Sequence, residues 1–150
     1  MNWNGKRVAL AVIDGFAAVS AFGGGYAVMA GMTPPDVDLA SGPLGWLISD
    51  YFVAGAILAV VVGGTALAAA IGTVLSRTAG AGLSFGAGLV MIGWIVGEVV
   101  LIGPSSWLQL AYGVVGIAML ALGFWLEPGE MRRLASGTTQ FRHRGDAPGA

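Results

Sequence analysis

The chain contains no cysteine and a single histidine, and only 10% of its residues are charged. Without cysteine, disulfides, thiolate nucleophiles and cysteine-ligated iron–sulfur clusters are excluded. The one histidine, His143, lies in a polar C-terminal segment, which excludes most haem and zinc sites. The formal net charge of −1 argues against nucleic-acid binding driven by overall basicity. We therefore expect no cofactor and no nucleic-acid partner.

Apolar side chains dominate what the chain does contain. Hydrophobic residues make up 56% of its 150 residues, and the mean hydropathy is +0.80. An average soluble domain carries about 25% charged residues, and a chain of this size cannot bury so much apolar surface behind so few charges. We therefore expect an integral membrane protein whose main partner is the lipid bilayer.

Four apolar runs of about 20 residues match the length that a hydrocarbon layer of about 30 Å requires. A lone strand cannot satisfy its backbone polar groups in lipid, so each run is expected to be a helix. The predicted fold is an all-α, polytopic bundle of four transmembrane helices within residues 1–126. The spans are expected at about 8–32, 52–75, 82–102 and 107–126. Residues 127–150 are polar and are expected to form a largely disordered cytoplasmic tail.

A cleavable signal peptide in the first apolar run is the less favoured alternative. The run is longer than the apolar core of a signal peptide, and Asp14 interrupts it. We therefore treat this run as the first membrane span.

Basic residues fall on one side of the four-span arrangement. Lys6 and Arg7 precede the first span, Arg77 lies between the second and third, and the other basic residues follow the fourth. Those others are Arg132, Arg133, Arg142 and Arg144. The two remaining connections contain no lysine or arginine. The positive-inside rule therefore predicts a multi-pass protein of the inner (plasma) membrane with both termini cytoplasmic.

Glycine is frequent, with 26 residues, and many lie inside the predicted spans. Small residues allow helices in lipid to approach closely. Glycines recur along one face of the third span and of the fourth: Gly82, Gly86, Gly93 and Gly97, then Gly116 and Gly123. We expect these faces to pack within the bundle, with a contact to a second copy as the alternative. The glycine runs at 23–25 and 63–64 predict a helix irregularity or a tight crossing.

Two carboxylates lie inside the predicted spans. Asp14 is about 9 Å from the cytoplasmic end of the first span, and Glu98 is about 6 Å from the outer end of the third, at about 1.5 Å per residue. In a layer of about 30 Å, about 15 Å separates them along the membrane normal. We expect them neither to form a hydrogen-bonded dyad nor to share a metal ion. Because a charge in hydrocarbon is costly, each is a candidate binding residue.

Aromatic and polar side chains are expected at the depth of Glu98. Trp94 precedes it by one helical turn, close enough for contact. The antiparallel arrangement places Tyr26 of the first span, and Gln109 and Tyr112 of the fourth, at the same level. Together they predict a polar binding pocket that opens outward. The structural alternative is that Glu98 extends its carboxylate to the membrane surface.

Asp14 has fewer polar neighbours at its depth. Thr73 and Ser84 lie at a comparable level, and Arg77 lies just below as a counter-ion. The structural alternative here is that Asp14 only joins helices through hydrogen bonds.

The segment around the third and fourth spans carries the most distinctive pattern. GWIVGEVVLIG is followed directly by PSSWLQLAYG, over residues 93–113, and a weaker pattern, PLGWL then SDYFVAGAIL, covers 43–64. The chain resembles uncharacterised four-helix integral membrane proteins of high-GC, actinobacterial bacteria. The resemblance implies the four-helix topology and no activity. The residues that carry it are Trp94, Glu98, Trp107, Leu108 and Gln109.

The layout is also similar, in architecture alone, to that of small multidrug resistance transporters. In that family an acid in the first of four short spans exchanges protons for a cationic drug. Here the acid would be Asp14, but its aromatic surroundings are absent and the chain has a longer outer loop and a tail. Because of these differences, the similarity to that family is only an analogy of architecture.

The chemistry of the spans favours a non-enzymatic role. They contain no histidine, cysteine or lysine, and neither Ser20 nor Ser84 has a base within sequence reach. The favoured function is a structural or accessory membrane subunit that packs through glycine-rich helix faces, in a homo-oligomer or a larger membrane complex. The alternative is a small proton-coupled transporter or channel that uses Glu98 and Asp14.

Overall fold

The computed structural model describes residues 5–32, 50–103 and 107–126, and the regular structure in this part of the chain is entirely helical. The helices are α1 (Gly5–Met29), α2 (Tyr51–Ile57), η2 (Leu58–Gly63), α3 (Gly64–Leu75), α4 (Arg77–Ile102) and α5 (Trp107–Leu126). Since α2, η2 and α3 run on as one helix, the described residues contain four helices long and apolar enough to cross a membrane. This confirms the all-α class. The predicted tail, 127–150, lies outside the described residues.

A single residue separates the second long helix from the third. Ser76 has an extended backbone, and its hydroxyl accepts a hydrogen bond from the Ala79 N–H at 3.4 Å as the cap of α4. The helix therefore begins at Arg77, whereas the apolar pattern predicted its start at 82. Hydropathy misses this first turn because the turn includes the polar residues Arg77 and Thr78.

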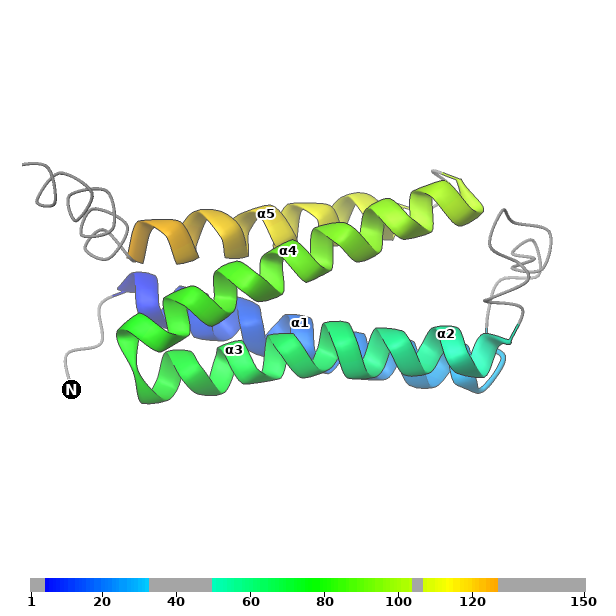
Figure 1. Cartoon of the computed structure of the whole chain (residues 1–150), viewed down its shortest axis with the longest axis horizontal. Coiled ribbons are helices and arrows are strands. Elements are labelled where there is room, and N and C mark those ends of the chain that lie inside the picture. The colour runs from blue at the N-terminus through cyan, green and yellow to red at the C-terminus, as the bar shows by residue number, and fades with distance from the viewer. Residues whose placement is uncertain (1–4, 33–49, 104–106, 127–150) are drawn as a thin grey trace, which may run out of the picture.

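The long helices alternate in direction. Figure 1 shows the start of α1, the α3–α4 turn and the end of α5 at one end of the molecule. Lys6 Nζ lies 5.2 Å from the centroid of the Trp125 ring, which ties the first helix to the last at that end. Asp50 caps α2 at the opposite end, where its carboxylate accepts a hydrogen bond from the Phe52 N–H at 2.8 Å.

The bundle consists of two helical hairpins that diverge. α1 packs along α2, η2 and α3, and α4 packs along α5. The hairpins meet chiefly where α3 turns into α4, and Figure 1 shows α4 moving away from the α2–α3 helix toward the far end. The main core cluster lies between the hairpins and is rich in alanine. Its buried members are Ala17, Ala18, Ala21, Val62, Ala66, Ala69, Ala87, Met91 and Met119.

Several glycines lie where helices cross closely. A Cβ on Gly25 would lie 2.6 Å from the Gly55 carbonyl oxygen, so α1 and α2 approach too closely for any side chain. On α5, a Cβ on Gly116 would lie 2.9 Å from Ile92 Cδ1, and one on Gly123 would lie 2.9 Å from the Ala81 carbonyl oxygen. These contacts confirm the tight crossing expected at 23–25 and the packing expected for the glycine face of α5.

The predicted glycine face of α4 behaves differently. A Cβ on Gly86, Gly93 or Gly97 would meet no described atom within 4 Å, and Gly82 is exposed. The expectation that this face packs within the bundle is therefore wrong. Gly80 and Gly88, on other sides of α4, make its close contacts with α3 and α5.

The second long helix contains a π-helical turn, η2, that ends at Gly63. The Phe22 ring of α1 lies against this glycine, where a Cβ would lie 3.2 Å from Phe22 Cε1. Thr65 Oγ1 donates to the Val61 carbonyl oxygen at 2.7 Å, so a side chain satisfies a backbone group next to the irregular turn. This confirms the irregularity predicted at 63–64.

Candidate functional site

Asp14 lies at the centre of a buried polar layer formed by three helices. Its carboxylate Oδ2 accepts a hydrogen bond from Ser84 Oγ of α4 at 2.5 Å and one from Thr73 Oγ1 of α3 at 3.4 Å. Asp14 and Ser84 are 0% exposed and Thr73 is 2% exposed. The two partners expected from depth alone are therefore the ones that the structure brings to Asp14.

One oxygen of this layer is unsatisfied. Asp14 Oδ1 is buried and accepts no hydrogen bond from any described residue. The distance of 3.4 Å from Thr73 Oγ1 to Oδ2 is also longer than a strong hydroxyl hydrogen bond, which spans about 2.5–3.0 Å. A partly satisfied polar network in a low-dielectric interior is costly, so this layer is the least satisfied part of the described core.

Arg7 lies on the same buried face of α1, two turns before Asp14. It is 7% exposed, and its Nε and Nη2 donate to the carbonyl oxygens of Thr73 at 2.7 Å and Val74 at 3.0 Å. Arg7 therefore satisfies carbonyl groups at the C-terminal end of α3, where the helix dipole is negative. The sequence indicated Arg7 only as a topology signal; its spacing of seven residues from Asp14 was the signal that it shares that face. The side chain of Arg77, expected as the counter-ion, lies outside the described residues.

Apolar clusters enclose the polar layer on both sides. Leu10, one turn before Asp14, packs with Ala81 and Leu126. Ala17 and Ala18, one turn after Asp14, belong to the main core cluster. The carboxylate is thus separated from the nearer end of the bundle by a layer of hydrocarbon.

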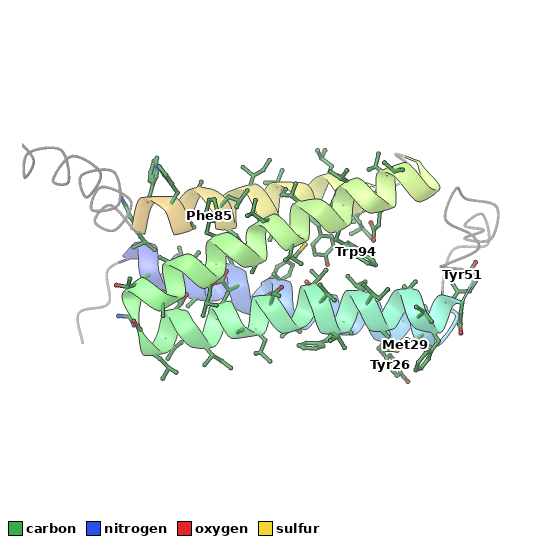
Figure 2. The ribbon with its side chains drawn as sticks, viewed as in Figure 1. Tyr26, Met29, Tyr51, Phe85 and Trp94 are labelled. Atoms are coloured by element: carbon green, nitrogen blue, oxygen red, sulfur yellow. The ribbon has the colours of Figure 1, made fainter. Side chains whose placement is uncertain are left out.

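The second carboxylate makes a different contact. Trp94 Nε1 donates to Glu98 Oε1 at 2.6 Å, one turn apart on α4, as the spacing predicted. Glu98 is half-buried. Trp94 and Tyr112 both pack against the main core cluster, and Figure 2 shows Trp94 on the side of α4 that faces the other hairpin.

The other residues expected around Glu98 have separate positions. Gln109 is buried, and its Nε2 donates to the Gly103 carbonyl oxygen at 3.2 Å, so it bridges the break between α4 and α5. Tyr26 is 67% exposed and, in Figure 2, lies beside Met29 on the outer side of α1, away from Trp94. The structure therefore brings Trp94 to Glu98 and does not bring Tyr26 to them.

The two carboxylates belong to distant sites. Ser84, which contacts Asp14, and Glu98 lie in the same helix, and their sequence separation corresponds to about 21 Å along its axis. This agrees with the expectation that they share neither a proton nor a metal ion. The described residues also contain no group of three or more histidine, cysteine or acidic side chains that could hold a metal ion.

Comparison with family models, with curated proteins and with solved structures finds no match for this chain.

Proposed function

We propose that this chain is an integral plasma-membrane protein with four spans and both termini in the cytoplasm. The four long apolar helices support the spans. The start of α1, with Lys6 and Arg7, lies at the same end as Arg77 at the start of α4, while the acidic cap Asp50 lies at the other end. This segregation of charge supports the orientation.

Within the membrane, the chain acts as a non-enzymatic structural or accessory subunit that packs through the glycine face of α4. The observation that carries this proposal is the open space beside Gly86, Gly93 and Gly97. Glycines at the helix crossings have close neighbours inside the bundle, whereas these three do not. In lipid, a glycine face permits close approach of a second helix, either from another copy or from a larger complex.

Cysteine cross-linking in native membranes tests this face, because the chain has no cysteine of its own. Val100 is 65% exposed on α4, two turns after Gly93, and Ile117 is 60% exposed on α5. We expect Val100→Cys to give oxidative cross-links to a second copy or to another membrane protein. Ile117→Cys is the matched control and should give far fewer. Equal cross-linking of the two variants contradicts the proposal.

Leucine substitutions provide an independent test of the same face. Gly93→Leu and Gly97→Leu fill the open space on α4, and we expect them to reduce the cross-linking of Val100→Cys. Gly15→Leu and Gly113→Leu fill open space on α1 and α5 and should leave it unchanged. Unchanged cross-linking in all four backgrounds would contradict a role for the glycine face.

A second candidate function, a small proton-coupled transporter, is favoured by one observation, the unsatisfied oxygen of buried Asp14. Its test is a pH-driven flux measured with a pH-sensitive dye inside proteoliposomes. The transporter predicts a flux above that of empty vesicles that Asp14→Asn abolishes. A flux no greater than that of empty vesicles, or one unchanged by both Asp14→Asn and Glu98→Gln, removes this candidate.

A further inference from the structure

In the polar layer around Asp14, the described side chains donate hydrogen bonds to only one of the two carboxylate oxygens. Ser84 and Thr73 both direct their hydroxyl groups to Oδ2, and buried Oδ1 receives none. A carboxylate in an apolar interior is costly unless it is paired and fully hydrogen-bonded. A ligand that brings positive charge to Oδ1 would therefore stabilise the packed bundle.

We propose that Asp14, Ser84 and Thr73 form a binding site for one monovalent metal cation of the size of Na⁺, held between α1, α3 and α4. All three side chains offer oxygen, the ligand atom that hard cations prefer. Thr73 Oγ1 lies 3.4 Å from Asp14 Oδ2 and 3.4 Å from Ser84 Oγ. Ser84 Oγ lies closer to Oδ2, at 2.5 Å, as a hydrogen-bond donor, so the ion would contact the carboxylate at the unsatisfied Oδ1. Because the three side chains are grouped so closely, a small ion fits between them better than a larger one such as K⁺.

The charge of the layer selects a monovalent ion. Asp14 is its one carboxylate among the described residues, and they contain no group of three or more acidic, histidine or cysteine side chains that could hold a divalent or transition metal. Arg7 donates to the Thr73 and Val74 carbonyl oxygens, so its positive charge lies against the negative end of the α3 dipole. Because Arg7 already brings one positive charge to this face of α1, a monovalent ion adds less buried charge than a divalent ion would.

The enclosure of the layer means that the ion is bound without most of its water. Leu10 and its apolar partners lie on one side of Asp14, and the alanines of the main core lie on the other. An ion held there joins three helices, so its binding free energy adds to the stability of the folded bundle. The site does not depend on the glycine face of α4, which lies elsewhere on that helix.

Thermal unfolding of the purified full chain in lipid nanodiscs tests the site. The melting temperature is measured by circular dichroism in NaCl, KCl or choline chloride at one pH and one ionic strength. We expect Na⁺ to raise it saturably, K⁺ to raise it less, and choline to leave it unchanged. Asp14→Asn should abolish the response, and Ser84→Ala should raise the half-saturating Na⁺ concentration roughly tenfold. Asp50→Asn, which retains a helix cap far from the layer, is the matched control and should keep the full response.

Two results would overturn the proposal. One is an equal melting temperature of the unsubstituted chain in the three salts, since the layer then binds no metal ion. The other is a Na⁺ response that survives in Asp14→Asn. Where Asp14→Asn does not fold, Thr73→Ser and Thr73→Val provide the test instead. Thr73→Ser keeps the hydroxyl oxygen and should keep the Na⁺ response, whereas Thr73→Val removes that oxygen and should weaken the response. Cross-linking through α4 is measured separately, so failure of the cation site leaves the proposed subunit role untouched.

Discussion

Arg7 and Lys6 are neighbours in the sequence, yet they make different contacts at the same end of the bundle. The Lys6 ammonium lies over the exposed Trp125 ring, where water competes with the interaction. The Arg7 guanidinium is buried, and two of its nitrogens donate to consecutive carbonyl oxygens of α3. A lysine at position 7 would keep the charge but lose the fork of donors that reaches both carbonyl groups.

We therefore expect Arg7→Lys to lower the free energy of unfolding by about 1–3 kcal/mol, the cost of leaving a buried polar group unsatisfied. The reciprocal change, Lys6→Arg, is the control and should alter it by less than about 0.5 kcal/mol, as is usual at exposed positions. Both variants keep the positive-inside signal. The measurement is unfolding in mixed micelles with increasing sodium dodecyl sulfate, followed by circular dichroism. Equal stabilities of the two variants would show that the carbonyl contacts of Arg7 contribute little.

Sequence predicts the depth of a residue in the bundle better than the direction in which it points. Depth follows from counting residues from a helix end, which correctly placed Thr73 and Ser84 beside Asp14. The rotation of a helix about its own axis depends on packing with all its neighbours. Tyr26 has a suitable depth for Glu98, but it faces outward because its neighbour Gly25 is directed at Gly55 of α2. The contact of Trp94 with Glu98 was predictable because both lie on one helix, where spacing alone sets the geometry.

At the scale of elements, the crossing of α1 and α2 depends on paired glycines. Gly25 of α1 and Gly55 of α2 meet backbone to backbone, so neither position has room for a Cβ. Two residues away, Gly23 is exposed, and a Cβ there would meet no described atom within 4 Å. The same substitution at these two glycines therefore separates the effect of packing from the effect of helix propensity.

We expect Gly25→Ala to destabilise the fold by about 1–3 kcal/mol, because the methyl group forces the two helices apart. Gly23→Ala should be neutral or stabilise by up to about 1 kcal/mol, because alanine favours a helix over glycine. Unfolding of the purified variants in mixed micelles measures both values. A loss of stability of similar size in the two variants would mean that the crossing is loose enough to accept a side chain.

The apolar runs predicted the four long helices because the thickness of the membrane's hydrocarbon layer sets how many consecutive apolar residues a spanning helix needs. They did not predict which glycine face packs inside the bundle. Gly86 and Gly93 have the same small side chain as Gly88, and only the packing of α4 on α3 and α5 distinguishes them. The π-helical turn was predicted in part, because the glycine pair at 63–64 marks its end, whereas its start at Leu58 has no comparable signal.

At the scale of the whole molecule, the bundle is asymmetric from end to end. Both hairpins meet near the α3–α4 turn, and the buried Asp14 layer joins three helices in that half. The described basic residues Lys6, Arg7 and Arg77 also lie at that end. The end at which the two hairpins meet is thus the end that the positive-inside rule assigns to the cytoplasm. The orientation can be tested by labelling opposite ends of the bundle.

Single cysteines provide that test in a chain that has none of its own. Met32 lies just after α1 and is 69% exposed, and Leu75 lies at the end of α3 beside the α3–α4 turn and is 76% exposed. We expect a membrane-impermeant maleimide added to intact cells to label Met32→Cys and to leave Leu75→Cys unlabelled until the membrane is permeabilised. The two positions are similarly exposed and differ mainly in the end of the bundle at which they lie. Labelling of Leu75→Cys in intact cells would reverse the orientation, and labelling of both without permeabilisation would exclude a chain that crosses the membrane between them.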